Sequence, residues 1–234
     1  MRVEFLERQM AERRARIVAA AQGIIGERGY AALTMRDLAR ASRVTVPTIY
    51  NLIGSKEEVL VAAVADRTQH YVARLTASAA LPPCKRVLAI VDAVVDEFLD
   101  APHYYRAMLG LIYASPAAAS LRVRTSREVQ QPLAGALEEL AAAGELASWA
   151  NPHALANQIE SLAQVASLRW ATGGISDEKM RVSTTYATAL LLLGVCSGGS
   201  RALLEKVARR SQSERPDAEA HAEDDGALAQ ESSS

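Results

Sequence analysis

Apolar side chains recur at intervals of three and four residues along most of this chain. That spacing is the period of an amphipathic helix, and no segment alternates apolar and polar residues as a half-buried strand would. Two clear stripes are formed by Ile17, Ala20, Ala21, Ile24 and Ile25, and by Val59, Leu60, Ala63 and Val64. Alanine and leucine are abundant and glycine is sparse, which also favours helices. The sequence therefore predicts an all-α fold.

Glycine and proline residues mark where these helices end. Gly29 follows the first stripe, the segment 80–83 contains two prolines, and Gly173 and Gly174 end another apolar pattern. Residues 117–143 form one helix or two, and Pro132 suggests a break there. Outside the motif described next, the predicted helices cover residues 12–28, 55–76, 84–100, 102–114, 117–143, 152–172, 176–194 and 201–210. The stripe over residues 84–100 is wide, so we expect that helix to be central and buried.

Residues 34–56 carry the most specific local pattern. Thr34 precedes Asp37 by three residues, Ser55 precedes Glu58 by the same interval, and Thr45 stands between the two pairs. A Ser or Thr with an acid three residues later satisfies free N–H groups at a helix start. The segment therefore indicates two short helices joined by a tight turn, and then the start of a third. This is a helix-turn-helix, whose second helix can enter the DNA major groove, so a DNA-binding regulator is the leading prediction.

Charge is unevenly distributed along the 234 residues, although the net charge is only −1. Residues 1–56 contain ten Lys or Arg and five acids, whereas residues 211–234 contain seven acids and one Arg. We predict a helix-turn-helix domain over residues 1–54 and a helical domain over residues 55–210. We expect residues 211–234 to be a disordered acidic tail, because they have little apolar surface to bury.

Several functional classes are disfavoured by the sequence. The longest apolar run, residues 187–196, is shorter than the roughly 20 residues that span a bilayer. No secretory signal is visible, and Cys84 and Cys196 are isolated thiols, so we expect a cytoplasmic protein without a disulfide framework. The four histidines, at positions 70, 103, 153 and 221, lack metal-ligand spacing. No phosphate-binding glycine loop or Gly-x-Ser-x-Gly turn occurs, so we expect no catalytic residues, cofactor or metal.

Four stretches of the N-terminal third form a longer pattern. They are Arg16–Gly29, then Leu33-Thr34-Met35-Arg36-Asp37-Leu38-Ala39 with Val44, then Pro47-Thr48-Ile49-Tyr50, and Gly54-Ser55-Lys56-Glu57-Glu58-Val59. In this pattern, which covers roughly residues 12–60, the chain resembles the TetR family, the tetracycline-repressor type of bacterial transcriptional regulator. The resemblance implies a homodimer that binds a palindromic operator in double-stranded DNA, in most members as a repressor.

The resemblance assigns phosphate contacts to Tyr50 and Lys56, which would fix the recognition helix without reading the DNA sequence. Thr34 and Thr45 open the two short helices, and Thr34 could also donate to a phosphate. Arg43 stands where family members usually have Gly, so either the turn is adjusted or Arg43 contacts a phosphate. The set expected to contact base edges is Arg36, Val46, Pro47, Thr48 and Asn51. An N-terminal arm that could follow the minor groove contains Arg2, Arg8, Arg13 and Arg14.

The resemblance also implies that the second domain binds a small-molecule effector and forms the homodimer. Residues 152–172 and 176–194 would pack against their symmetry mates, although the apolar residues 190–195 could instead be buried within one chain. Candidate ligand contacts are His103, Tyr104, Tyr105, Met108, Tyr113, Trp149 and Trp170. Few charges fall on inward faces, which favours a largely apolar effector. Its binding would move the helix over residues 55–76 and spoil the spacing of the two recognition helices.

Two other functions stay open from the sequence alone. One is a helical adaptor that binds protein and has lost specific DNA binding, which only Arg43 in the turn encourages. The other is an enzyme, which the absence of the motifs above disfavours. Specific DNA binding separates the regulator from the adaptor, and turnover of a bound ligand would identify an enzyme.

Overall fold

The computed structural model describes residues 2–114 and 119–213. Regular structure in these ranges is helical apart from one isolated antiparallel bridge between Leu146 and Cys196, which confirms the all-α class. The α-helices are α1 (Arg2–Arg28), α2 (Met35–Ser42), α3 (Val46–Leu52), α4 (Lys56–Ala77), α5 (Pro83–Asp100), α6 (Pro102–Ala114), α7 (Ala119–Ala142), α8 (Pro152–Ala171), α9 (Asp177–Leu193) and α10 (Gly198–Ser213). Two 3-10 turns complete the chain order, η1 (Tyr30–Ala32) and η2 (Ser78–Ala80).

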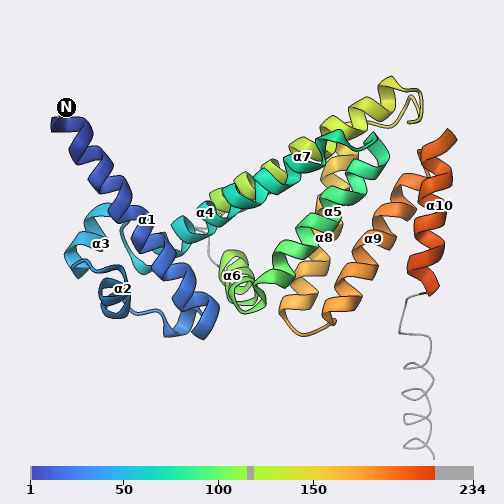
Figure 1. Cartoon of the computed structure of the whole chain (residues 1–234). Coiled ribbons are helices and arrows are strands. Elements are labelled where there is room, and N and C mark those ends of the chain that lie inside the picture. The colour runs from blue at the N-terminus through green and yellow to red at the C-terminus, as the bar shows by residue number, and fades with distance from the viewer. Residues whose placement is uncertain (1, 115–118, 214–234) are drawn as a thin grey trace, which may run out of the picture.

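The helices form an elongated molecule with the helix-turn-helix at one end. Figure 1 shows α1, α2 and α3 grouped at that end and α10 at the other, where it packs against α9. The helix α4 leaves the first group and runs along α7, while α6 lies between α1 and α8. Thus α4 and α6 are the two elements that connect the helix-turn-helix to the larger bundle.

The hydrophobic core has two parts. One contains residues of α5 and α7–α10, and the other contains residues of α1–α4 and the inner face of α6, together with Val95, Trp170, Ile175 and Met180. Ile17 and Ile25 of the first predicted stripe are fully buried in this second part, beside Val59 and Ala63 of the next stripe. The residues of α6 in the same cluster are Tyr104, Tyr105, Met108 and Leu109. The predicted domain boundary at residue 54 therefore falls inside a continuous core, and the domain division stays a prediction.

Three elements differ from their predicted ranges. The helix α1 begins at Arg2 because residues 2–11 contain good helix formers and no breaker, although they lack an apolar stripe that would have indicated it. Residues 119–142 form one helix with Pro132 inside it. The neighbouring Leu133 and Leu137 are buried, and this burial offsets the hydrogen bond that proline cannot donate. Residues 211–213 end α10, and the rest of the predicted tail lies outside the described residues.

Candidate DNA-binding surface and internal cavity

Side-chain caps fix the starts of α2 and α4. Thr34 Oγ1 accepts the Asp37 N–H at 3.0 Å and donates to the Asp37 carboxylate at 2.7 Å. Ser55 and Glu58 cap α4 reciprocally, since the Ser55 N–H donates to Glu58 Oε2 at 2.7 Å and the Glu58 N–H donates to Ser55 Oγ at 3.3 Å. The bonds from Ser55 lower the pKa of Glu58. This cap is therefore complete above the ordinary carboxyl pKa and is lost as the pH falls through the lowered one.

The turn between α2 and α3 depends on Arg43. Its backbone is in the left-handed region, at φ 55° and ψ 46°, and it is the one non-glycine residue with positive φ in the described ranges. The Arg43 N–H donates to Arg40 O, and the Val44 N–H donates to Ala39 O at 3.0 Å, which closes the end of α2. The turn thus keeps the geometry that glycine usually supplies, and Arg43 bears the strain with its side chain exposed.

Replacing Arg43 with Gly is expected to raise the free energy of unfolding by about 1 kcal/mol, because a side chain in the left-handed region costs roughly that much. Urea denaturation of both proteins measures the difference. Arg40→Gly is the matched control, since Arg40 lies in the last turn of α2 and loses about 1 kcal/mol of helix propensity. Destabilisation by both substitutions would contradict the strain at Arg43.

The helix α3 is anchored by Ile49, which is fully buried, and its opposite face is exposed. Tyr50 is 53% exposed, so its ring is not part of the core. Thr45 Oγ1 accepts the Thr48 N–H at 3.3 Å, and the two hydroxyl groups lie 2.8 Å apart. The remaining predicted DNA contacts on α2, α3 and the turn are exposed at Thr34, Arg36, Arg43, Pro47 and Asn51, and half-buried at Val46. The predicted contact residues therefore lie on two consecutive helices that pack together.

Two long-range contacts position this surface. The Lys56 ammonium lies 4.4 Å from the centroid of the Tyr30 ring, a cation–π contact at the first turn of α4. Arg14 Nη1 donates to Leu52 O at 2.7 Å, so α1 holds the end of α3. The predicted N-terminal arm is thus the first part of α1, and Arg14 binds the protein's own backbone. These partners are far apart in sequence, and no local pattern identifies them.

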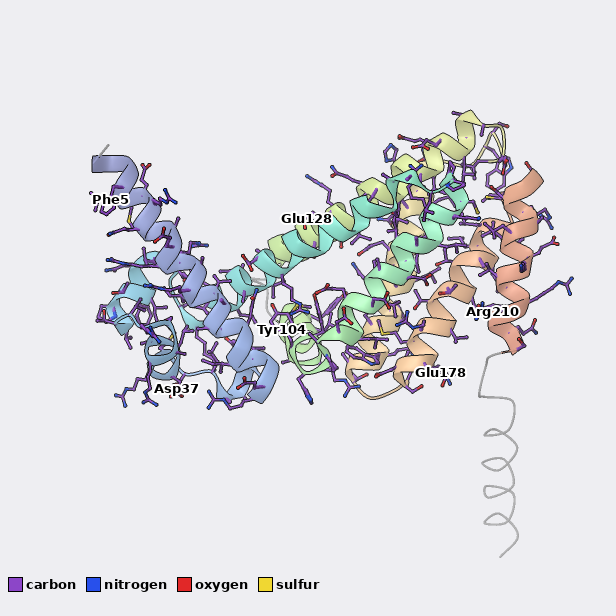
Figure 2. The ribbon with its side chains drawn as sticks, viewed as in Figure 1. Phe5, Asp37, Tyr104, Glu128, Glu178 and Arg210 are labelled. Atoms are coloured by element: carbon purple, nitrogen blue, oxygen red, sulfur yellow. The ribbon has the colours of Figure 1, made fainter. Side chains whose placement is uncertain are left out.

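A cavity of about 120 Å³ lies between α4, α5, α6, α7 and α8. A cavity of ~150 Å³ in another protein holds one benzene molecule, so this one has room for a group of similar size. Figure 2 shows Tyr104, one of the lining residues, on α6 between the helix-turn-helix and the bundle. The apolar and aromatic part of the lining includes Val64, Val94, Phe98, Met108, Leu109 and Tyr113. Two carboxylates, those of Glu97 and Glu160, also face the cavity.

Three polar side chains, Arg67, Glu97 and Tyr105, join α4, α5 and α6 beside the cavity, and we call this group the Arg67 clamp. Arg67 Nε donates to Glu97 Oε1 at 2.7 Å, and the Tyr105 hydroxyl donates to the same oxygen at 2.7 Å. The guanidinium carbon lies 5.3 Å from the ring centroids of Tyr104 and Tyr105. Because Glu97 lines the cavity, the clamp connects the cavity wall to α4.

The chain is similar to proteins of a known family and to solved structures. Residues 17–63 match the family described as "Bacterial regulatory proteins, tetR family". A TetR-family transcriptional regulator from Pectobacterium atrosepticum is 25% identical, with a TM-score of 0.69 over 81% of this chain and 97% of that chain. The chain belongs to the TetR family.

Other solved structures share the fold of this TetR-family chain at lower identity. The repressor of the Stenotrophomonas maltophilia multidrug efflux pump is 17% identical, with a TM-score of 0.61 over 80% of this chain and 92% of that chain. A TetR transcription regulator from Haloarcula marismortui is 15% identical, with a TM-score of 0.68 over 80% of this chain and all of that chain (100%). No curated protein sequence matches the chain.

Family membership makes this protein a DNA-binding transcription regulator rather than an enzyme. In the ranges that the structure describes, no cluster of His, Cys, Asp or Glu could hold a metal ion. Cys84 and Cys196 are free and buried, and burial raises the pKa of Cys196 to about 11, so this thiol is protonated at neutral pH. No helix among the described residues is long and apolar enough to cross a membrane.

The structure separates the predicted ligand contacts into two groups. Those that line the cavity are Tyr104, Tyr105, Met108 and Tyr113. His103 and Trp149 are exposed, Trp149 by 76%, and Trp170 is fully buried with its indole N–H donating to Asp177 at 2.6 Å. The sequence reasoning did not identify the polar part of the lining, which includes Glu97, Ser126, Glu160 and Gln164. An acidic residue on the inward, apolar face of a helix is the signal in the sequence that could have identified Glu97 and Glu160.

Proposed function

We propose that this TetR-family regulator is a repressor that binds a palindromic operator as a homodimer and leaves the DNA when a small molecule fills the cavity. The observation that carries the proposal is the position of the cavity between α4 and α6. Val64 of α4 and Met108 of α6 line it, and both belong to the core cluster that contains Ile17 of α1. A ligand that displaces either side chain therefore moves an element packed against the helix-turn-helix.

Release from DNA requires that the effector bind the free conformation more tightly than the operator-bound one. In the bound dimer the two α3 helices would enter successive major grooves, about 34–36 Å apart. A shift of α4 would alter that separation, since α4 begins directly after α3. The repressor role is supported by the similar fold of the efflux-pump repressor named above. A cytoplasmic location, where the chromosome is accessible, is part of the same proposal.

Fluorescence anisotropy with the DNA upstream of the protein's own gene, at two salt concentrations, tests the proposal. We expect tight, sequence-specific binding that weakens as salt rises, because phosphate contacts release counterions. If this DNA is not bound specifically, selection from genomic fragments follows. Failure of that selection with an intact dimer would support the alternative function, a helical adaptor that binds protein.

The proposed dimer interface is formed by α8 and α9. Large apolar side chains are exposed on both helices, at 36% for Leu162, 58% for Val165 and 47% for Leu190. The two helices pack against each other within one chain, so their exposed faces are available together. Leu192, by contrast, is fully buried, so the apolar end of α9 is shared between the core and the exposed face. Burial of an exposed apolar face against a symmetry mate is the usual basis of a homodimer.

Leu190→Arg is expected to convert the dimer to a monomer at micromolar concentration, because it would place two guanidinium groups near the symmetry axis without partners. Sedimentation velocity measures the change in mass. Val123→Arg is the matched control, since Val123 is 60% exposed on α7, away from the proposed interface. A dimer that survives Leu190→Arg but not Val123→Arg would move the interface to α7.

A further inference from the structure

Glu160 of α8 is a buried carboxylate that faces the cavity and is bonded to neutral groups alone. Only 7% of Glu160 is exposed to solvent. Ser126 Oγ donates to Oε1 at 2.9 Å, Gln130 Nε2 donates to Oε2 at 3.4 Å, and Gln164 Nε2 also donates to Oε1. Hydroxyl and amide donors orient a carboxylate, but they do not neutralise its charge. A buried charge is costly unless an opposite charge accompanies it.

The other carboxylate of the cavity has the cation that Glu160 lacks. Glu97 is 5% exposed and forms an ion pair with Arg67 at 2.7 Å. Among the side chains that the structure describes, no Lys, Arg or His forms an ion pair with Glu160. Glu160 is therefore a buried carboxylate at the cavity wall whose described partners do not compensate its negative charge.

The Tyr104 hydroxyl is a second buried polar group at the cavity, and it differs from Glu160 in having no described hydrogen-bond partner. Tyr104 is 1% exposed and lines the cavity, and its hydroxyl makes no hydrogen bond in the described structure. A buried hydroxyl without a protein partner is uncommon in a native structure, so the Tyr104 hydroxyl is free to bond to a molecule in the cavity. The hydroxyl oxygen can accept a hydrogen bond from an N–H group. Tyr113 adds an aromatic wall, fixed by its bond to Gln164 at 3.2 Å.

We propose that the effector is a small organic cation, an amine that is protonated at neutral pH and carries an apolar or aromatic body. Its ammonium group would pair with Glu160 and donate to Tyr104, and its body would lie against the apolar lining near Met108 and Leu109. This inference rests on the proposed function, in which the cavity is the effector site. It modifies the sequence-based expectation of a largely apolar effector, because one end of the proposed ligand carries a charge.

Three probes with the same aromatic ring test the charge preference, namely phenethylammonium, phenethyl alcohol and phenylacetate. Isothermal titration calorimetry on the full-length protein gives each dissociation constant without DNA. We expect phenethylammonium to bind about ten- to a hundredfold more tightly than the alcohol, and phenylacetate to bind most weakly, because a hydrogen-bonded charge pair contributes that much. Glu160→Gln keeps the shape and removes the charge, so it should bring the ratio of the dissociation constants for the alcohol and phenethylammonium close to one.

Glu178→Gln is the matched control, because it removes the same charge from an exposed position on α9. Equal affinity for the three probes, or a cation preference that survives Glu160→Gln, would overturn the inference, and so would an absence of binding by all three. Release of operator DNA is measured separately. If phenethylammonium binds through Glu160 and the operator stays bound, the inference stands and the proposed release mechanism fails.

Discussion

Lys56→Ala is expected to weaken DNA binding about tenfold or more on every sequence, specific or not. The ammonium is held beside the start of α4 by the Tyr30 ring, where the family resemblance places a phosphate contact. A charged hydrogen bond contributes about 1.5–3 kcal/mol, and a homodimer would lose it twice. The slope of the logarithm of affinity against the logarithm of salt concentration should fall by about 1 for each lost contact. Anisotropy titrations on operator and random DNA at several salt concentrations measure both quantities.

Tyr50→Phe should also weaken DNA binding, because it removes a hydroxyl donor. The dependence of affinity on salt concentration should not change, because that hydroxyl is neutral. The exposed ring of Tyr50 makes this substitution harmless to the core. Lys206→Ala is the matched control for Lys56→Ala, since Lys206 is exposed on α10 at the opposite end of the molecule. Unchanged binding after Lys56→Ala, or an equal loss after Lys206→Ala, would show that the start of α4 does not contact DNA.

Base readout is a separate property of the same surface. Arg36 is exposed at the first turn of α2 and can take a guanine edge, whereas Val46 and Pro47 can meet only apolar groups such as thymine methyls. Asn51 is exposed on the next turn of α3. Substitutions in this set would change which DNA sequence is preferred, while those at Tyr50 and Lys56 would change affinity on all sequences.

The sequence predicted the helix-turn-helix well because its signals are local. Thr34, Thr45 and Ser55 each cap a helix through a group three residues away, so the cap and its partner appear together in any reading of the chain. The apolar stripes also predicted which faces of α1, α4 and α5 are buried. Pro132 shows the limit of such signals, because burial of neighbouring side chains outweighed a strong helix breaker.

The cavity was less predictable because it depends on five helices that meet only in the fold. Of the aromatic residues chosen as candidate ligand contacts, Tyr104 and Tyr113 line the cavity, whereas Trp149 is exposed. Glu160 was the stronger signal. It lies on the face of α8 that also carries Ala156, Ile159 and Ala163, all of them buried. A carboxylate on the buried face of a helix needs hydrogen-bond or charge partners. The sequence indicates that Glu160 requires such partners, but it does not identify them.

The Arg67 clamp yields the second large expected effect. Arg67→Met is expected to lower the free energy of unfolding by about 2–4 kcal/mol, because it leaves the Glu97 carboxylate buried without its cation. The estimate lies below the usual cost of breaking a buried pair, since the Arg67 side chain is 28% exposed and solvent screens part of its charge. Urea denaturation measures the loss. Glu97→Gln in the same chain should recover most of it, because the carboxylate that needed the cation is then neutral.

The same double-mutant cycle tests whether the clamp couples the cavity to α4. Arg67 of α4 binds both α5 and α6, and its partner Glu97 faces the cavity. The effect of a ligand on DNA binding is the ratio of the operator affinity without ligand to the operator affinity with ligand. If a ligand acts on α4 through this pair, Arg67→Met should reduce this ratio, even if it also changes the operator affinity without ligand. An interaction energy between the two substitutions in the free energy of unfolding, but none in this ratio of operator affinities, would mean that the clamp stabilises the bundle without transmitting the effector signal. Coupling would then pass through the apolar contacts of Val64 and Met108, which a ligand in the cavity would touch directly.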